Sequence, residues 1–339
     1  MLGRSLKPLI AFLALAILAH VPAAGQSPPS AGKSNASAAA KKWTLPRTPG
    51  GHPDMQGIWS NALLTPLERP DEFADKPAFT KAEAAAYEKQ VLERSNVDRR
   101  TALGSDADVA LAYNNAWYDR GSKVVKTLRT SLIVDPPDGR IPVLTPDAQR
   151  RAAERAEARR LHPADGPEDR PLNERCLLTV TTGPPMLPGP YNNNYQLVQA
   201  PNSIAIFNEM EHEVRTIPTD GRPHLPRHIR LWKGDSVGHW EGDTLVIDTT
   251  NFTGKTNFRG SGENLHLVER LTRLDADTLL YRFTVDDPAS FTRPWTAEMT
   301  SMRTEGPILE YACHEGNYAM RGILSAARAE EKKAVEKTK

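Results

Sequence analysis

From Tyr195 onward, apolar and polar residues alternate in short runs that turn residues separate. This period of two is typical of strands that bury one face. The Gly-, Pro- and Asp-rich turns are short, so successive strands should be antiparallel neighbours. The pattern predicts a meander of about ten strands, at 196–200, 203–208, 213–217, 227–233, 237–240, 244–250, 266–274, 278–286, 295–303 and 308–315.

The chain before this meander mixes helices with extended segments. A short strand is expected at 58–59, and a capping box at 80–83 precedes an apolar-periodic helix. A second helix is expected within 145–161, where Thr145 and Pro146 are typical of a helix start. The β-branched run and proline-rich turn within 128–143 predict a hairpin.

These elements predict an α+β, mainly β fold. The C-terminal antiparallel meander has enough strands for a calycin-like barrel or half-barrel. We expect residues 43–175 to form a mixed helix and hairpin region that packs on a barrel domain at 176–325. A charged tail follows at 326–339.

The first 25 residues are typical of a secretory signal peptide. They combine a basic start, an apolar run at 8–21 and the small residues 23–25 before a cleavage site. The alternative is a membrane anchor, but the run is short for a hydrocarbon core of roughly 30 Å. Residues 26–42 are rich in Ser, Ala, Pro and Lys, which predicts a flexible linker. The expected location is periplasmic or secreted.

The balance of charged residues bears on which partners the protein binds. The chain has 43 basic and 42 acidic residues, and cleavage would remove only the basic Arg4 and Lys7. A near-neutral chain lacks the basic excess that neutralises phosphates, so no nucleic-acid partner is expected. We predict a small-molecule substrate or ligand, with no membrane association after cleavage. The sequence makes no prediction of oligomeric state.

Cys176 and Cys313 are the two cysteines of the chain. Disulfides persist in exported proteins, and no third cysteine competes, so we expect one bridge between them. Two buried free thiols are the alternative.

Several long motifs carry a resemblance. The segments at 48–59, 130–142, 184–196, GDSVGHWEGDTLVIDTTNF at 234–252 and EYACHEGNY at 310–318 resemble a family of secreted bacterial proteins that is known mainly as uncharacterised. The likeness extends from Trp43 to Leu324 and implies an exported bacterial protein. It implies no catalytic residue.

Residues 209–215 offer the first candidate chemistry. On a strand, Glu209, Glu211 and Glu213 would share one face with Arg215. His212 would lie on the opposite, apolar face, where a histidine can act as a general base. The alternative is a solvated acidic face and a hydrogen-bonded core histidine.

Two more strands carry carboxylates among apolar residues. Glu269 interrupts an apolar face, so it must be paired, protonated or functional, and a general acid is one possibility. Glu310 and His314 would share a strand face that also holds apolar residues, as in a ligand-binding lumen. The alternative is a structural pair between Glu310 and Arg270 or Arg303.

Amides and aromatic rings are the candidate ligand contacts. Three successive asparagines at 192–194 lie between two tyrosines, and such groups recognise hydroxyl or carbonyl ligands well. The alternatives are local turn chemistry for the asparagines and core packing for the tryptophans. The predicted ligand-binding residues are Tyr191, Asn193, Asn194, Arg215, Trp295 and Tyr311.

Metal and cofactor signals are weak. His224 and His228 have i,i+4 spacing, but Pro223 and Pro226 disfavour the helix that would bring the rings together. HExxH, CxxC, GxGxxG, P-loop and GxSxG motifs are absent from the sequence. We therefore predict no metal and no cofactor.

Two functions remain. One is an exported acid–base enzyme, a hydrolase, lyase or isomerase, with His212, Glu269, Glu310 and His314 as its catalytic residues. The other is a lipocalin-like binding protein for an apolar or aromatic molecule. The enzyme hypothesis requires these four residues to converge in one pocket.

Overall fold

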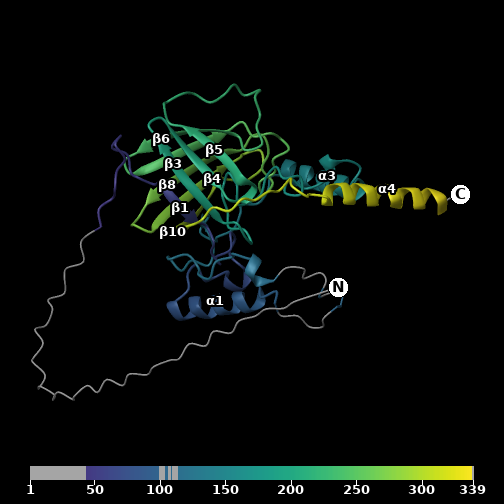
Figure 1. The fold of residues 1–339 in the computed structure, drawn as a ribbon, viewed down its shortest axis with the longest axis horizontal. Helices are drawn as coiled ribbons and strands as arrows, with labels where there is room; N and C mark the ends of the chain where they lie inside the picture. Colours follow the sequence, from purple (N-terminus) through teal and green to yellow (C-terminus); the bar gives the residue numbers. More distant parts are fainter. Residues whose placement is uncertain (1–42, 99–103, 106–107, 109–113, 338–339) are drawn as a thin grey trace, which may run out of the picture. The chain divides into compact units, whose positions relative to one another are not determined.

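The computed structural model describes residues 43–98, 104–105, 108 and 114–337. The predicted signal peptide and linker lie outside these residues. One antiparallel sheet of ten strands dominates the described chain (Figure 1). Its strands are β1 (Gly57–Ser60), β2 (Ile133–Asp135), β3 (Asn194–Ala200), β4 (Ser203–Asn208), β5 (Glu213–Pro218), β6 (Asp235–Glu241), β7 (Thr244–Thr250), β8 (His266–Arg273), β9 (Thr278–Asp286) and β10 (Trp295–Thr304).

The strand order is β5-β4-β3-β1-β10-β9-β8-β7-β6, and β2 also pairs with β10. The sheet curves, but no ladder closes it between β5 and β6 in the described chain. These edge strands nevertheless approach closely, since a Cβ atom on Gly238 would lie 2.9 Å from Cγ2 of Ile217. The predicted mainly β, α+β fold is confirmed, whereas a closed barrel is not formed.

Three helices accompany the sheet in the described residues: α1 (Lys81–Arg94), α3 (Pro146–Leu161) and α4 (Ala319–Lys337). Thr80 and Glu83 form the predicted capping box of α1, and the Thr145 side chain caps α3. Residues 326–337 of the predicted charged tail belong to α4, which extends away from the sheet and buries no residue (Figure 1). Single 3-10 turns occur at Asp71–Phe73, Asn115–Trp117, Pro167–Asp169 and Met210–His212.

Three predicted elements are wrong. Residues 227–233 form turns with one isolated bridge at Leu231, and residues 308–315 form an irregular segment. The hairpin predicted within 128–143 is not formed, because β2 pairs with the distant β10 instead.

The inside of the curved sheet is packed with side chains. Alternate residues of each strand enter a core that includes Leu197, Ile217, Leu267 and Phe283. The short β1 also enters this core through Trp59, which is fully buried. The sheet therefore offers little free interior for a ligand.

An ion pair is buried in the same interior. Arg215 of β5 donates two hydrogen bonds to Glu269 of β8, at 2.8 and 3.0 Å, and their side chains are 7% and 0% exposed. The Tyr281 hydroxyl donates to Glu269 Oε1 at 2.6 Å and accepts the Met186 N–H at 3.1 Å. Burial and the neighbouring carboxylate raise the pKa of Tyr281 well above its ordinary value. Burial alone would lower the pKa of Arg215, but Glu269 raises it.

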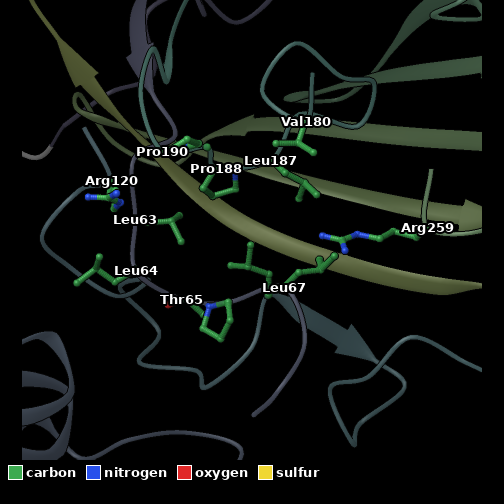
Figure 2. Close-up of a pocket in the computed structure, with 13 residues that line it drawn as sticks. Leu63, Leu64, Thr65, Leu67, Arg120, Val180, Leu187, Pro188, Pro190 and Arg259 are labelled. Atoms are coloured by element: carbon green, nitrogen blue, oxygen red, sulfur yellow. The ribbon is translucent and has the colours of Figure 1, made fainter. Parts of the chain in front are cut away.

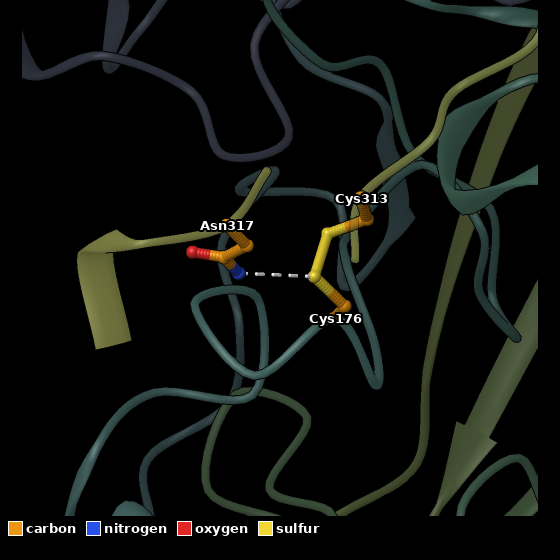
Figure 3. The surroundings of a disulfide bond; sticks show 3 residues. All are labelled: Cys176, Cys313 and Asn317. Atoms are coloured by element: carbon orange, nitrogen blue, oxygen red, sulfur yellow. Dashed lines mark hydrogen bonds between the residues drawn. A yellow bond between two sulfur atoms is a disulfide. The ribbon is translucent and has the colours of Figure 1, made fainter. Parts of the chain in front are cut away.

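β1 ends and β3 begins at the same end of the sheet, where Ser60 pairs with Asn194. The long connection between them includes α1, β2 and α3. The predicted disulfide joins Cys176 of this connection to Cys313, which follows β10 (Figure 3). The Asn317 amide donates to Cys176 Sγ at 3.6 Å. The bridge spans 137 residues of sequence, and closing a loop of this size stabilises a fold by about 4–5 kcal/mol in chain-entropy estimates.

Removing one partner of the buried ion pair should be far more damaging than removing both. We expect Glu269→Leu or Arg215→Met to lower the free energy of unfolding by about 3–5 kcal/mol, because the remaining charge is left unpaired. The Arg215→Met/Glu269→Leu double variant should be more stable than either single variant. Urea denaturation of all three measures this.

The exposed pair between Arg47 and Asp243 provides the control. Asp243→Asn should change the free energy of unfolding by no more than about 1 kcal/mol. Strictly additive losses for the buried pair would contradict the prediction.

Candidate functional site

A pocket of about 590 Å³ lies where the loops at this end of the sheet meet. Its lining combines four aromatic rings with three carboxylates, and the described residues that line it include no lysine, arginine or histidine. We call it the acidic aromatic pocket. It is lined by Ala116, Trp117, Tyr118, Asp119, Tyr191, Asn192, Asn194, Glu209, Leu309, Glu310 and Tyr311.

Asn193 holds two walls of this pocket together. Its side-chain amide donates to the carbonyl oxygens of Asp119 and Gly189, and its Oδ1 accepts the Gly189 N–H at 2.7 Å. The Asp119 N–H also donates to the Pro190 carbonyl at 3.0 Å. Asn193 is fully buried, so it supports the pocket from behind, whereas its neighbours Asn192 and Asn194 line it.

Glu209 joins the sheet to the third wall. It directly follows β4, and its N–H donates to the Asn194 carbonyl at 2.9 Å. Its Oε1 accepts the Leu309 N–H at 3.1 Å, which fixes the segment that carries Glu310 and Tyr311. Two residues after Tyr311, the disulfide at Cys313 anchors the same segment again.

The aromatic rings come from three separate segments. The Tyr191 ring lies between those of Tyr118 and Tyr311, with centroid distances of 6.3 and 6.5 Å. Trp117 adds a fourth ring that is 67% exposed. Arg120 stacks on Tyr118, 3.7 Å from the ring centroid, but does not line this pocket.

The structure gathers some predicted site residues and separates others. Tyr191, Asn194, Glu310 and Tyr311 all line the acidic aromatic pocket. Of the four predicted catalytic residues, Glu310 alone lines it. The convergence that the enzyme hypothesis requires is therefore not observed.

The other predicted residues lie elsewhere. His212 is exposed in a turn and packs edge-on against Phe207, so its predicted place on the apolar face of a strand is wrong. The reason is the left-handed backbone of Glu211 and His212, which interrupts the strand alternation. His314 is exposed in the irregular segment after β10.

Three predicted site residues, the catalytic candidate Glu269 and the ligand-binding candidates Arg215 and Trp295, belong to the core. Arg215 and Glu269 form the buried ion pair, so neither lines the acidic aromatic pocket. Trp295 is fully buried and stacks near Phe258, where it fills the core.

Sequence reasoning missed Trp117, Tyr118, Asp119 and the role of Glu209. The first three are consecutive, with two adjacent aromatic residues followed by a carboxylate, and this clustering was an available signal. Glu209 was predicted to lie on a strand face. The tight turn that follows it contains no glycine, so the sequence did not predict a turn there.

An apolar cleft of about 400 Å³ adjoins the same loops. Leucine and proline side chains lie between Arg120 and Arg259 (Figure 2). The two sites are lined by neighbouring residues of the same loops. Asp119 lines the acidic aromatic pocket and Arg120 lines the cleft, and Tyr191 and Pro190 are divided in the same way.

A chain of carboxylates and imidazoles crosses β6, β7 and β8. His224 Nδ1 and Nε2 contact Asp235 Oδ2 and Asp248 Oδ1, each at 2.9 Å. Asp248 Oδ2 contacts His266 Nε2 at 2.7 Å. The hydrogen bond to Asp248 raises the pKa of His266, and burial opposes this. Burial alone would raise the pKa of Asp248, but His266 and His224 lower it below its ordinary value. His224 and His266 line a pocket of about 620 Å³ with Arg227 and Arg230.

The described residues contain no group of three or more His, Cys, Asp or Glu side chains arranged to hold a metal ion. Within the same part of the chain, no helix combines the length and apolar character needed to cross a membrane.

Comparison with family models, curated proteins and solved structures found no match for this chain.

The Asp248–His266 pair should make stability depend on pH. The raised pKa of His266 contributes stability below its unfolded value of 6.5, and this is lost as pH rises through the folded value. The lowered pKa of Asp248 contributes above 3.8 and is lost as pH falls through the folded value. Both contributions are present between these two values, so His266→Gln should be most destabilising there.

We expect that loss to be on the order of 0.5–1 kcal/mol, since the pair is partly screened by solvent. Urea denaturation across the pH range measures it, and the exposed His228→Gln is the control. A loss that is no larger between pH 3.8 and 6.5 than at more acid and more alkaline pH would contradict the prediction.

Proposed function

We propose that this is an exported small-molecule-binding protein whose ligand occupies the acidic aromatic pocket. The observation that carries the proposal is the convergence of four aromatic rings from three distant segments on one concave site. Ligand sites in proteins are typically concave and aromatic-lined, with few polar groups that fix orientation. Here Asn192, Asn194 and the carboxylates supply those groups.

The filled interior of the sheet also favours this pocket over a lumen. In a calycin-like half-barrel the ligand would lie inside the sheet, but Arg215, Glu269 and Tyr281 occupy that space. We therefore infer a half-barrel that binds its ligand at one end. Export is supported by the signal-like first 25 residues and by the Cys176–Cys313 disulfide, which an oxidising compartment permits.

The proposal predicts that small aromatic compounds bind through the tyrosines. A panel of neutral, anionic and cationic single-ring compounds should include ligands that raise the Tm of the full chain. Tyr191→Ala and Tyr311→Ala should weaken their binding about tenfold or more, as loss of a central aromatic contact does. Isothermal titration calorimetry measures the affinities.

Tyr318→Ala is the matched control, because Tyr318 is 78% exposed and outside the pocket. It should leave affinity within about twofold of the wild type. Failure of every compound to bind, or binding that is indifferent to Tyr191, would refute the proposal.

A second candidate, acid–base catalysis, is favoured by the Asp248–His266 pair. A carboxylate that orients an imidazole is the usual support of a general base. His266 Nδ1 makes no hydrogen bond to another described residue, and Arg227 and Arg230 line the same pocket. These residues differ from the catalytic set predicted from the sequence.

An anionic activated ester, 4-nitrophenyl succinate, tests this candidate. If His266 is a general base, hydrolysis should exceed the rate without protein and fall at least about tenfold in His266→Gln. His228→Gln should retain the wild-type rate. Release of nitrophenolate is measured by absorbance, and turnover that is independent of His266 would exclude this role.

A further inference from the structure

We propose that the ligand of the acidic aromatic pocket is a small organic cation, with the buried carboxylate of Glu209 as its counter-charge. This inference rests on the proposed function and specifies its ligand class. The juxtaposition behind it is three carboxylates and four aromatic rings around one cavity, with no basic side chain among the described residues that line it.

The unpaired charge is the first argument. Glu209 is 3% exposed, and its side chain makes one hydrogen bond within the described residues, from the Leu309 N–H. None of Asp119, Glu209 and Glu310 forms an ion pair with another described residue. Burying a carboxylate without a cation is costly, and grouping three like charges adds repulsion. A bound cation would relieve both costs.

The rings provide the second argument. The faces of Tyr and Trp rings attract ammonium groups, and several rings around one site form a cage for alkylated ammonium ions. The chain already shows this contact next to the pocket, where the Arg120 guanidinium stacks on Tyr118 at 3.7 Å. Tyr191 has no guanidinium stacked on it within the described chain.

Other ligand classes fit less well. An anion would face three carboxylates, and none of the described lining residues would offer it a positive charge. A neutral aromatic molecule would satisfy the rings but would leave Glu209 without a counter-charge. A bare metal ion is disfavoured, because the carboxylates here do not form a metal-binding group among the described residues.

An isosteric pair of probes tests the charge directly. (4-Hydroxyphenyl)trimethylammonium and 4-tert-butylphenol differ only in a positive nitrogen that replaces a carbon. We expect calorimetry on the full chain to give at least about tenfold tighter binding of the cation. Glu209→Gln should reduce that preference about tenfold or more, while the affinity for 4-tert-butylphenol changes less than about twofold.

Two further variants separate a direct contact from long-range charge and from misfolding. Glu310→Gln removes an exposed carboxylate of the same lining, so it should also lower affinity for the cation without endangering the fold. Glu305→Gln removes an exposed carboxylate outside the lining and should have no such effect.

The outcomes are distinguishable. Equal, Tyr191-dependent binding of both probes would overturn the cation inference and leave the proposed function standing. Equal losses in Glu305→Gln and both lining variants would also overturn it, since the effect would then come from net charge. Binding of neither probe, together with failure of the wider panel, would overturn both proposals.

Discussion

Arg215 and Glu269 face each other inside the sheet, and neither charge can be removed alone without leaving the other unpaired in a medium of low dielectric. The pair joins β5, at one end of the strand order, to β8 in the other half, so it connects the two halves of the curved sheet across their common core. Tyr281 and the Met186 N–H extend the network to the loop before β3. These groups fill the interior of the sheet, and the acidic aromatic pocket is formed by the loops at its end instead.

Those loops are held by polar contacts rather than by a core of their own. Asn193 ties the segments at 119 and 189 together, and Glu209 ties the sheet to the segment at 309. The disulfide then anchors that last segment to the connection between β1 and β3. Each wall of the acidic aromatic pocket is therefore fixed by a different interaction, and the aromatic rings line the cavity between these walls.

Most of the sheet was predictable, because alternation reports a buried face directly. Predicted and observed strands nearly coincide at β8 and β9. Alternation does not show whether a neighbouring strand has a free edge with which to pair. This explains why the strand predicted at 308–315 is not formed. That segment follows β10, whose sides are already occupied by β9 and by β1 and β2. In the pocket, Tyr191 and Tyr311 were predictable from side-chain chemistry, whereas Trp117 reaches the site through a long connection whose path no local pattern encodes.

The turn after β4 shows why Glu209 escaped prediction and why its position is informative. Glu211 and His212 adopt φ values of 59° and 53°, a conformation that costs residues with side chains about 1–3 kcal/mol each. Burial also raises the pKa of Glu211 to about 7, against the opposing attraction of Lys233. A turn that only reversed the chain would favour glycine here. This turn instead keeps two residues in left-handed backbone directly after Glu209, and strain of this kind persists only where the surrounding structure holds it.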